Sequence, residues 1–99
     1  VDMRSIPIMK DFGFPVVIDA THSVQIPGGA GDRSGGNSRF AAYIAKAGVA
    51  VGADGIFLEV HENPERALSD GPNSLPLSRI PSLLRELLSI YSVVQGGKR

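Results

Sequence analysis

The sequence of 99 residues predicts an α/β fold with parallel strands, and two features carry that prediction. Two short apolar runs, residues 16–19 and 56–58, each turn polar where the run ends. Runs of this kind are typical of parallel strands that are buried on both faces. Each run is also followed by a segment with apolar residues at helical spacing, and right-handed crossovers make strands connected in this way parallel.

The first half of the chain is expected to hold a short helix, a strand and a loop. The helix covers residues 5–12, with Ser5 as its N-cap and Gly13 as its left-handed exit. The strand at 16–19 comes next. Residues 26–36 contain five glycines and a proline, so we expect a long loop there rather than a helix or a strand.

A second helix is expected to follow that loop. Asn37 or Ser38 supplies its N-cap, and Gly52 ends it. Apolar side chains recur at helical spacing between these limits and predict one buried face, made of Phe40, Ala41, Ile44, Ala45 and Val49.

The second strand, 56–58, leads into another loop and a final helix. The loop covers residues 62–77 and contains three prolines, and Ser78 is the expected cap of the helix. We expect a sheet to cover the helix's apolar stripe, which consists of Ile80, Leu83, Leu84, Leu87, Leu88, Tyr91 and Val94. A polar, frayed tail is expected over 95–99.

Composition excludes several classes of function. Ten Lys and Arg balance ten Asp and Glu, so the formal net charge of zero gives no overall attraction to nucleic acid or to an anionic membrane. The absence of cysteine excludes a disulfide framework and thiolate ligands from this chain. No signal peptide is indicated, and no apolar run approaches the ~18 residues of a membrane span, so we expect a cytoplasmic protein.

Polar residues at the strand ends are the candidates for chemistry. Right-handed crossovers bring the end of each strand to the same edge of the sheet, so His22 and Glu59 are expected there, with Asp70 in the loop beyond. One imidazole and two carboxylates suit Mn²⁺, Fe²⁺ or Zn²⁺. The alternative is that His22 is a hydrogen-bonded strand-end residue and that both carboxylates cap loops. His61, two residues after Glu59, could be a fourth ligand, but we expect it instead to be structural or to hydrogen-bond to a metal ligand.

Other residues near the first strand end have more than one interpretation. Asp19 could orient His22 or position water, and Gln25 could donate to an anionic ligand. Each of the two residues could equally satisfy backbone groups at the strand end. Ser23 and Thr21 lie near His22 and suggest a Ser-His pair, but the chain has no Gly-x-Ser-x-Gly elbow, so covalent hydrolysis is not favoured.

The glycine-rich loop does not have the sequence of a nucleotide site. A phosphate-binding loop requires a lysine where Asn37 stands, and a dinucleotide fingerprint requires a glycine where Ser34 stands. The remaining interpretations are a loop that closes over a site, with Arg33 able to meet an anion, or a solvated connector.

Four motifs, in this order, closely resemble the 3-deoxy-D-manno-octulosonate 8-phosphate synthase family. They are Asp19-Ala20-Thr21-His22-Ser23-Val24-Gln25, Pro27-Gly28-Gly29, Phe57-Leu58-Glu59 and Ala67-Leu68-Ser69-Asp70-Gly71-Pro72. The resemblance implies a (β/α)8 TIM barrel, a fold typically of ~250 residues. Residues 1–99 would then be the C-terminal portion of this single barrel domain, with about strands seven and eight and their flanking helices.

The resemblance also implies an activity and a set of site residues. Phosphoenolpyruvate would condense with D-arabinose 5-phosphate and water, releasing phosphate, in lipopolysaccharide biosynthesis. His22 and Asp70 would be catalytic, while Gln25 and Arg33 would contact substrate. In the metal-dependent branch His22, Glu59 and Asp70 would hold a divalent metal, and in the other branch there would be no cofactor.

Several points stay open at this level. The residue that separates the two branches, a Cys or an Asn, would lie upstream of Val1, and the family suggests a homotetramer. The closest alternative is 3-deoxy-D-arabino-heptulosonate 7-phosphate synthase, which uses erythrose 4-phosphate. The loop from Val24 to Gly29 favours the octulosonate enzyme. A non-catalytic barrel fragment is the alternative from another class.

Overall fold

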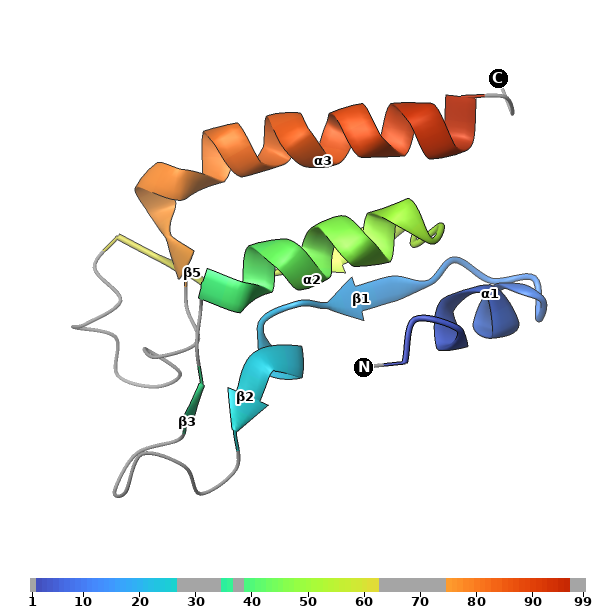
Figure 1. Ribbon diagram of the computed structural model, residues 1–99, viewed down its shortest axis with the longest axis horizontal. Helices are drawn as coiled ribbons and strands as arrows, with labels where there is room; N and C mark the ends of the chain where they lie inside the picture. The colour runs from blue at the N-terminus through green and yellow to red at the C-terminus, as the bar shows by residue number, and fades with distance from the viewer. Residues whose placement is uncertain (1, 27–34, 37–38, 63–74, 97–99) are drawn as a thin grey trace.

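The computed structural model describes residues 2–26, 35–36, 39–62 and 75–96 and has an α/β architecture, as the sequence predicts. Figure 1 shows its helices and strands along the chain. They are α1 (Ser5–Lys10), β1 (Val17–Asp19), a 3₁₀ turn (His22–Val24), β2 (Gln25–Ile26), β3 (Gly35–Gly36), α2 (Arg39–Ala50), β4 (Gly55–Phe57), β5 (Val60–His61), β6 (Leu75–Pro76), a second 3₁₀ turn (Leu77–Arg79) and α3 (Ile80–Gln95).

The two predicted strands lie side by side as a parallel pair. β1 pairs with β4, and Ile18 lies opposite Ile56 in the register. Helix α2 connects the two strands and packs on the face that carries these isoleucines. Contact is close at Gly48, where an added Cβ would lie 2.8 Å from Ile18 Cγ2. A residue without a side chain therefore lets the helix approach the strand.

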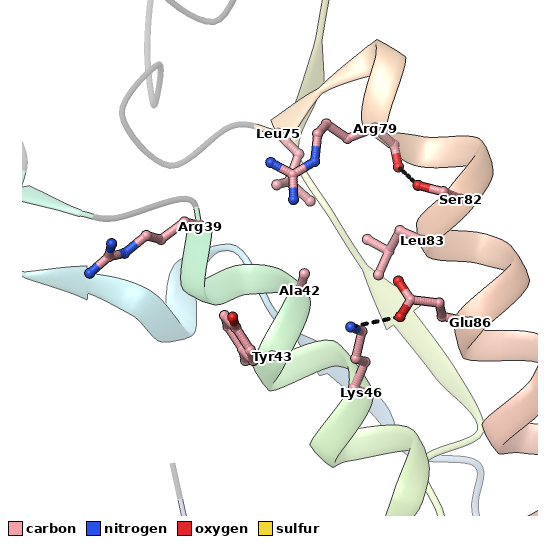
Figure 2. A pocket seen from close by; sticks show the side chains of 9 residues that line it. All are labelled: Arg39, Ala42, Tyr43, Lys46, Leu75, Arg79, Ser82, Leu83 and Glu86. Atoms are coloured by element: carbon pink, nitrogen blue, oxygen red, sulfur yellow. Dashed lines mark hydrogen bonds and ion pairs between the residues drawn. The ribbon is translucent and has the colours of Figure 1, made fainter.

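Helix α3 packs on α2 rather than on the strand pair, and Figure 1 shows α2 between α3 and β1. Leu83 and Leu87 of α3 are buried with small residues of α2. An ion pair also links the two helices, since Lys46 Nζ lies 2.9 Å from Glu86 Oε2 (Figure 2).

The expectation that a sheet covers the whole apolar stripe of α3 is wrong for the described residues. Leu84 is 47% exposed and Leu88 is 65% exposed. The reason is geometric, because α2 is a single cylinder and reaches only one side of the stripe. Phe40 was also expected to be buried, but it lies in the first turn of α2 and is 42% exposed.

Burial of the strands on both faces is also not found. Val17 is 62% exposed and Phe57 is 47% exposed, whereas Ile18 is buried. Side chains alternate between the faces of a strand, and among the described elements α2 covers only one face. Val17, Asp19 and Phe57 therefore share an open face.

The ends of the helices confirm some predicted signals and contradict others. Gly13 and Gly52 have φ values of 91° and 109°, which confirms both as left-handed exits. Neither predicted serine cap is correct. Ser5 is the first residue of α1, and its hydroxyl donates to the Asp2 carbonyl. Ser78 lies inside a 3₁₀ turn, so α3 begins later, at Ile80.

The predicted loops have short paired segments at their described ends. β2 pairs with β3 in an antiparallel arrangement, and β5 pairs with β6 in a parallel one. The expectation that 26–36 and 62–77 contain no strand is therefore wrong at Ile26, at 35–36 and at 75–76. The predicted caps at 37–38 lie outside the described residues. No helix in the described part of the chain is both long and apolar enough to cross a membrane.

Candidate functional site

The candidate site lies where the chain leaves β1. The backbone N–H of Ala20 donates to the Phe57 carbonyl at 3.1 Å and extends the pairing with β4 by one step. The chain then turns into the 3₁₀ segment, and the Thr21 carbonyl accepts from the N–H of Val24 at 3.3 Å. This turn places the side chain of His22 beside the strand end rather than beyond it.

Asp19 holds His22 through two hydrogen bonds. Its Oδ2 lies 2.7 Å from His22 Nδ1, and its Oδ1 accepts the His22 backbone N–H at 2.9 Å. Two of the interpretations of Asp19 drawn from the sequence are therefore correct together, since one carboxylate orients the ring and satisfies the backbone. Ser23 donates its hydroxyl to the Asp19 carbonyl, so this serine interacts with the backbone of the turn.

The surroundings of Asp19 keep it ionised. Partial burial raises the pKa of this carboxyl, whereas hydrogen bonds from the backbone and ring of His22 lower it. The charge of a protonated His22 ring and a hydrogen bond from the Thr21 backbone also lower it, so the pKa of Asp19 is below its ordinary value of 3.8. At neutral pH an acceptor therefore faces His22 Nδ1.

The ring of His22 lies over the open face of the strand pair. Its centroid is 6.2 Å from that of Phe57, and the two planes are tilted by 30°. Phe57 is the register partner of Asp19 on this face. Glu59 follows two residues after Phe57, at the end of the neighbouring strand.

Thr21 joins the two strand ends. Its Oγ1 accepts the backbone N–H of Glu59 at 2.7 Å, and Thr21 is fully buried. The Glu59 carbonyl accepts the N–H of Leu75 at 2.9 Å on the other side. Sequence reasoning placed Thr21 near His22 but missed its contact with Glu59, for which the only signal was a β-branched hydroxyl at a strand end.

The remaining predicted site residues are described in part or not at all. Asp70 and Arg33 lie outside the described residues, and Gln25 is described through its backbone pairing in β2. Within the described residues no three His, Asp or Glu side chains come close enough to hold a metal ion. The convergence of His22, Glu59 and Asp70 therefore stays a prediction.

A pocket of about 170 Å³ lies between α2 and α3, outside this site (Figure 2). Arg39 and Arg79 contribute to its lining, and the Lys46–Glu86 ion pair crosses it. None of the predicted site residues lines it. We therefore place the candidate site at the strand ends rather than in this pocket.

Comparison with known proteins gives one consistent group of relatives. The sequence pattern of the DAHP synthetase I family matches residues 1–93. The 2-dehydro-3-deoxyphosphooctonate aldolase of Geobacter metallireducens is 61% identical over 94 residues, which are 95% of this chain and 35% of that protein. The enzyme of the same name from Syntrophobacter fumaroxidans is 62% identical over 95 residues, 96% of this chain and 33% of that protein.

Solved structures add a more distant relative. The phospho-2-dehydro-3-deoxyheptonate aldolase (DAHP synthase) of Thermotoga maritima superposes with a TM-score of 0.78 at 32% identity. The match covers 95% of this chain and 25% of that one. The chain thus spans about a third of the length of the curated relatives it matches.

Proposed function

The chain belongs to the DAHP synthetase I family, and from this premise we propose that it forms part of a 3-deoxy-D-manno-octulosonate 8-phosphate synthase. Such an enzyme joins phosphoenolpyruvate to the aldehyde of D-arabinose 5-phosphate, adds water and releases phosphate. The observation that carries this choice is the identity of 61–62% to relatives named for the octulosonate reaction, against 32% to the heptulosonate enzyme.

The proposed architecture is a (β/α)8 barrel, to which residues 1–99 contribute the C-terminal portion. The parallel pairing of β1 with β4 through α2 supports this arrangement. The open face with Val17 and Phe57 is then the side that the remaining strands would enclose. Sites in such barrels lie at the carboxyl ends of the strands, where His22 follows β1.

His22 is proposed as the central residue of the site. Because Nδ1 is held by Asp19, Nε2 is the ring atom that acts on a ligand. In this role His22 binds a metal or orients the attacking water. Asp70 is proposed to act beside it, and Gln25 and Arg33 are proposed to bind the phosphorylated substrates.

The described part of the donor set fits a divalent metal. Metal-binding histidines typically have the second ring nitrogen held by a carboxylate, as Asp19 holds His22. Mn²⁺, Fe²⁺ or Zn²⁺ would be held by His22, Glu59 and Asp70 in the metal-dependent branch, and the bound ion would supply a Lewis acid for an oxygen of substrate or water. In the metal-free branch the same side chains position water. Assembly as a homotetramer is part of the proposal.

The test uses the complete protein that carries these residues. Turnover is measured as phosphate release from phosphoenolpyruvate with either D-arabinose 5-phosphate or erythrose 4-phosphate. We expect faster turnover with the five-carbon sugar, and faster use of erythrose 4-phosphate would instead assign the heptulosonate reaction. A His22→Ala variant tests the non-catalytic alternative, because unchanged turnover would remove the role of His22.

A further inference from the structure

We propose that Thr21 is a positioning residue that fixes Glu59 relative to His22, and this inference rests on the proposed function. Thr21 precedes His22 directly, and its hydroxyl accepts the backbone N–H of Glu59 at 2.7 Å. One hydrogen bond therefore joins the side chain of Thr21, the residue before His22, to the backbone of Glu59.

This hydrogen bond replaces a backbone bond that the turn removes. Pairing of β1 with β4 ends with the bond from Ala20 to Phe57, because the chain then turns into the 3₁₀ segment. The Thr21 carbonyl takes part in that turn and accepts from Val24. The next N–H of the neighbouring strand end belongs to Glu59, and the Thr21 hydroxyl supplies its acceptor.

Burial makes the hydroxyl hard to replace. Thr21 is 0% exposed and Glu59 is half-buried, so the Glu59 N–H that loses this acceptor keeps part of the cost of its desolvation. The opposite side of Glu59 is fixed as well, since its carbonyl accepts from Leu75. Glu59 is thus held between two neighbouring segments, and Thr21 is the contact that relates it to His22.

The choice of threonine has two separable parts. Its hydroxyl is the acceptor, and its methyl is buried with the rest of the side chain. Valine keeps the shape and loses the acceptor, whereas serine keeps the acceptor and loses the methyl. A positioning role predicts that the acceptor decides activity.

The experiment compares Thr21→Val, Thr21→Ser and Ser89→Ala in the complete protein. Ser89 is a matched control, because its hydroxyl is bonded to Arg85 on the exposed side of α3. For each variant we would measure kcat, KM for phosphoenolpyruvate, the unfolding midpoint and deuterium exchange at the Glu59 amide.

We expect Thr21→Val to lower kcat about 10–100-fold with little change in KM, as for the loss of a residue that orients a ligand. Exchange at the Glu59 amide should become faster. Thr21→Ser and Ser89→Ala should keep kcat within about threefold of the wild type, which is well below the tenfold that 1.4 kcal/mol represents. If Thr21→Val does not fold, Thr21→Ala removes the same acceptor and must show the same loss of kcat.

Two results would overturn the proposal. The first is a folded Thr21→Val or Thr21→Ala variant with unchanged kcat, and the second is a Thr21→Ser variant as impaired as Thr21→Val. A wild-type protein without activity on either sugar would instead refute the proposed function. The exchange at the Glu59 amide would then still test the contact by itself.

Discussion

Replacing Asp19 with asparagine should weaken activity without removing the fold. The carboxylate accepts two hydrogen bonds, from the His22 backbone at 2.9 Å and at Nδ1 of the ring at 2.7 Å. A carboxamide has a single oxygen. If that oxygen keeps the backbone bond, its NH₂ group faces Nδ1, and the ring proton must move to Nε2. Nε2, the nitrogen proposed to act on a ligand, would then carry a proton and could no longer accept a bond.

The expected loss follows from this change of tautomer. Residues that orient a metal-binding or catalytic histidine typically contribute 10–100-fold in activity or metal affinity. Each factor of ten corresponds to about 1.4 kcal/mol, so we expect Asp19→Asn to cost about 1.4–2.7 kcal/mol of transition-state stabilisation. Because Asp19 and His22 are both partly exposed, we expect the effect on stability to be smaller.

The assay is kcat/KM with phosphoenolpyruvate and D-arabinose 5-phosphate in the complete protein. Asp2→Asn is the matched control, because it removes the same charge from an exposed carboxylate that pairs with Arg4. The control should keep full activity. If Asp19→Asn also keeps kcat/KM within about twofold, orientation of His22 by Asp19 has no role in the reaction.

Acid unfolding tests the same contact independently. The pKa of Asp19 is lower in the folded chain than its ordinary value of 3.8. Its carboxylate therefore stabilises the fold above pH 3.8, and this contribution disappears as the pH falls through the lower folded-state pKa. The difference in unfolding free energy between wild type and Asp19→Asn should shrink below pH 3.8. A difference that stays constant down to pH 2 would contradict the assignment.

Three further predictions concern the packing that supports the site. Gly48→Ala should destabilise the protein by about 1 kcal/mol in urea unfolding. Overpacking against Ile18 costs about 1–3 kcal/mol, and the better helix propensity of alanine offsets about 1 kcal/mol of this cost. A more stable variant would contradict this reasoning. Asp54→Ala should cost about 1–3 kcal/mol by removing the acceptor of a backbone N–H before β1, whereas Asp54→Asn, which keeps an oxygen, should cost less. Leu87→Ala should cost about 2–5 kcal/mol and the exposed Val93→Ala less than about 0.5, so equal melting temperatures would refute the packing of α3.

The sequence predicted those features that depend on nearby residues. Runs of apolar residues placed both strands, and apolar residues at helical spacing placed α2 and α3. The glycines at 13 and 52 marked helix exits because only a residue without Cβ adopts a positive φ readily. The proximity of Asp19 to His22 was also predictable, since three residues separate them along the chain.

Serine caps were predicted wrongly because cap signals are local and weak. Ser5 and Ser78 both have the residue type of an N-cap. Ser5, however, is the first helical residue of α1, and Ser78 lies within the 3₁₀ turn before α3. The short pairings β2–β3 and β5–β6 were missed for a related reason. Two-residue strands carry no hydrophobic period that a sequence can show.

By itself the sequence determined the order of β1, α2, β4 and α3, the parallel arrangement of β1 and β4, and the polar candidates that follow these strands. Only the tertiary structure decided which apolar faces are covered, because burial depends on where α2 lies relative to β1 and α3. It also decided that Thr21 meets Glu59. That contact joins residues far apart in the chain, and nothing in the pattern around either residue specifies the distance between them.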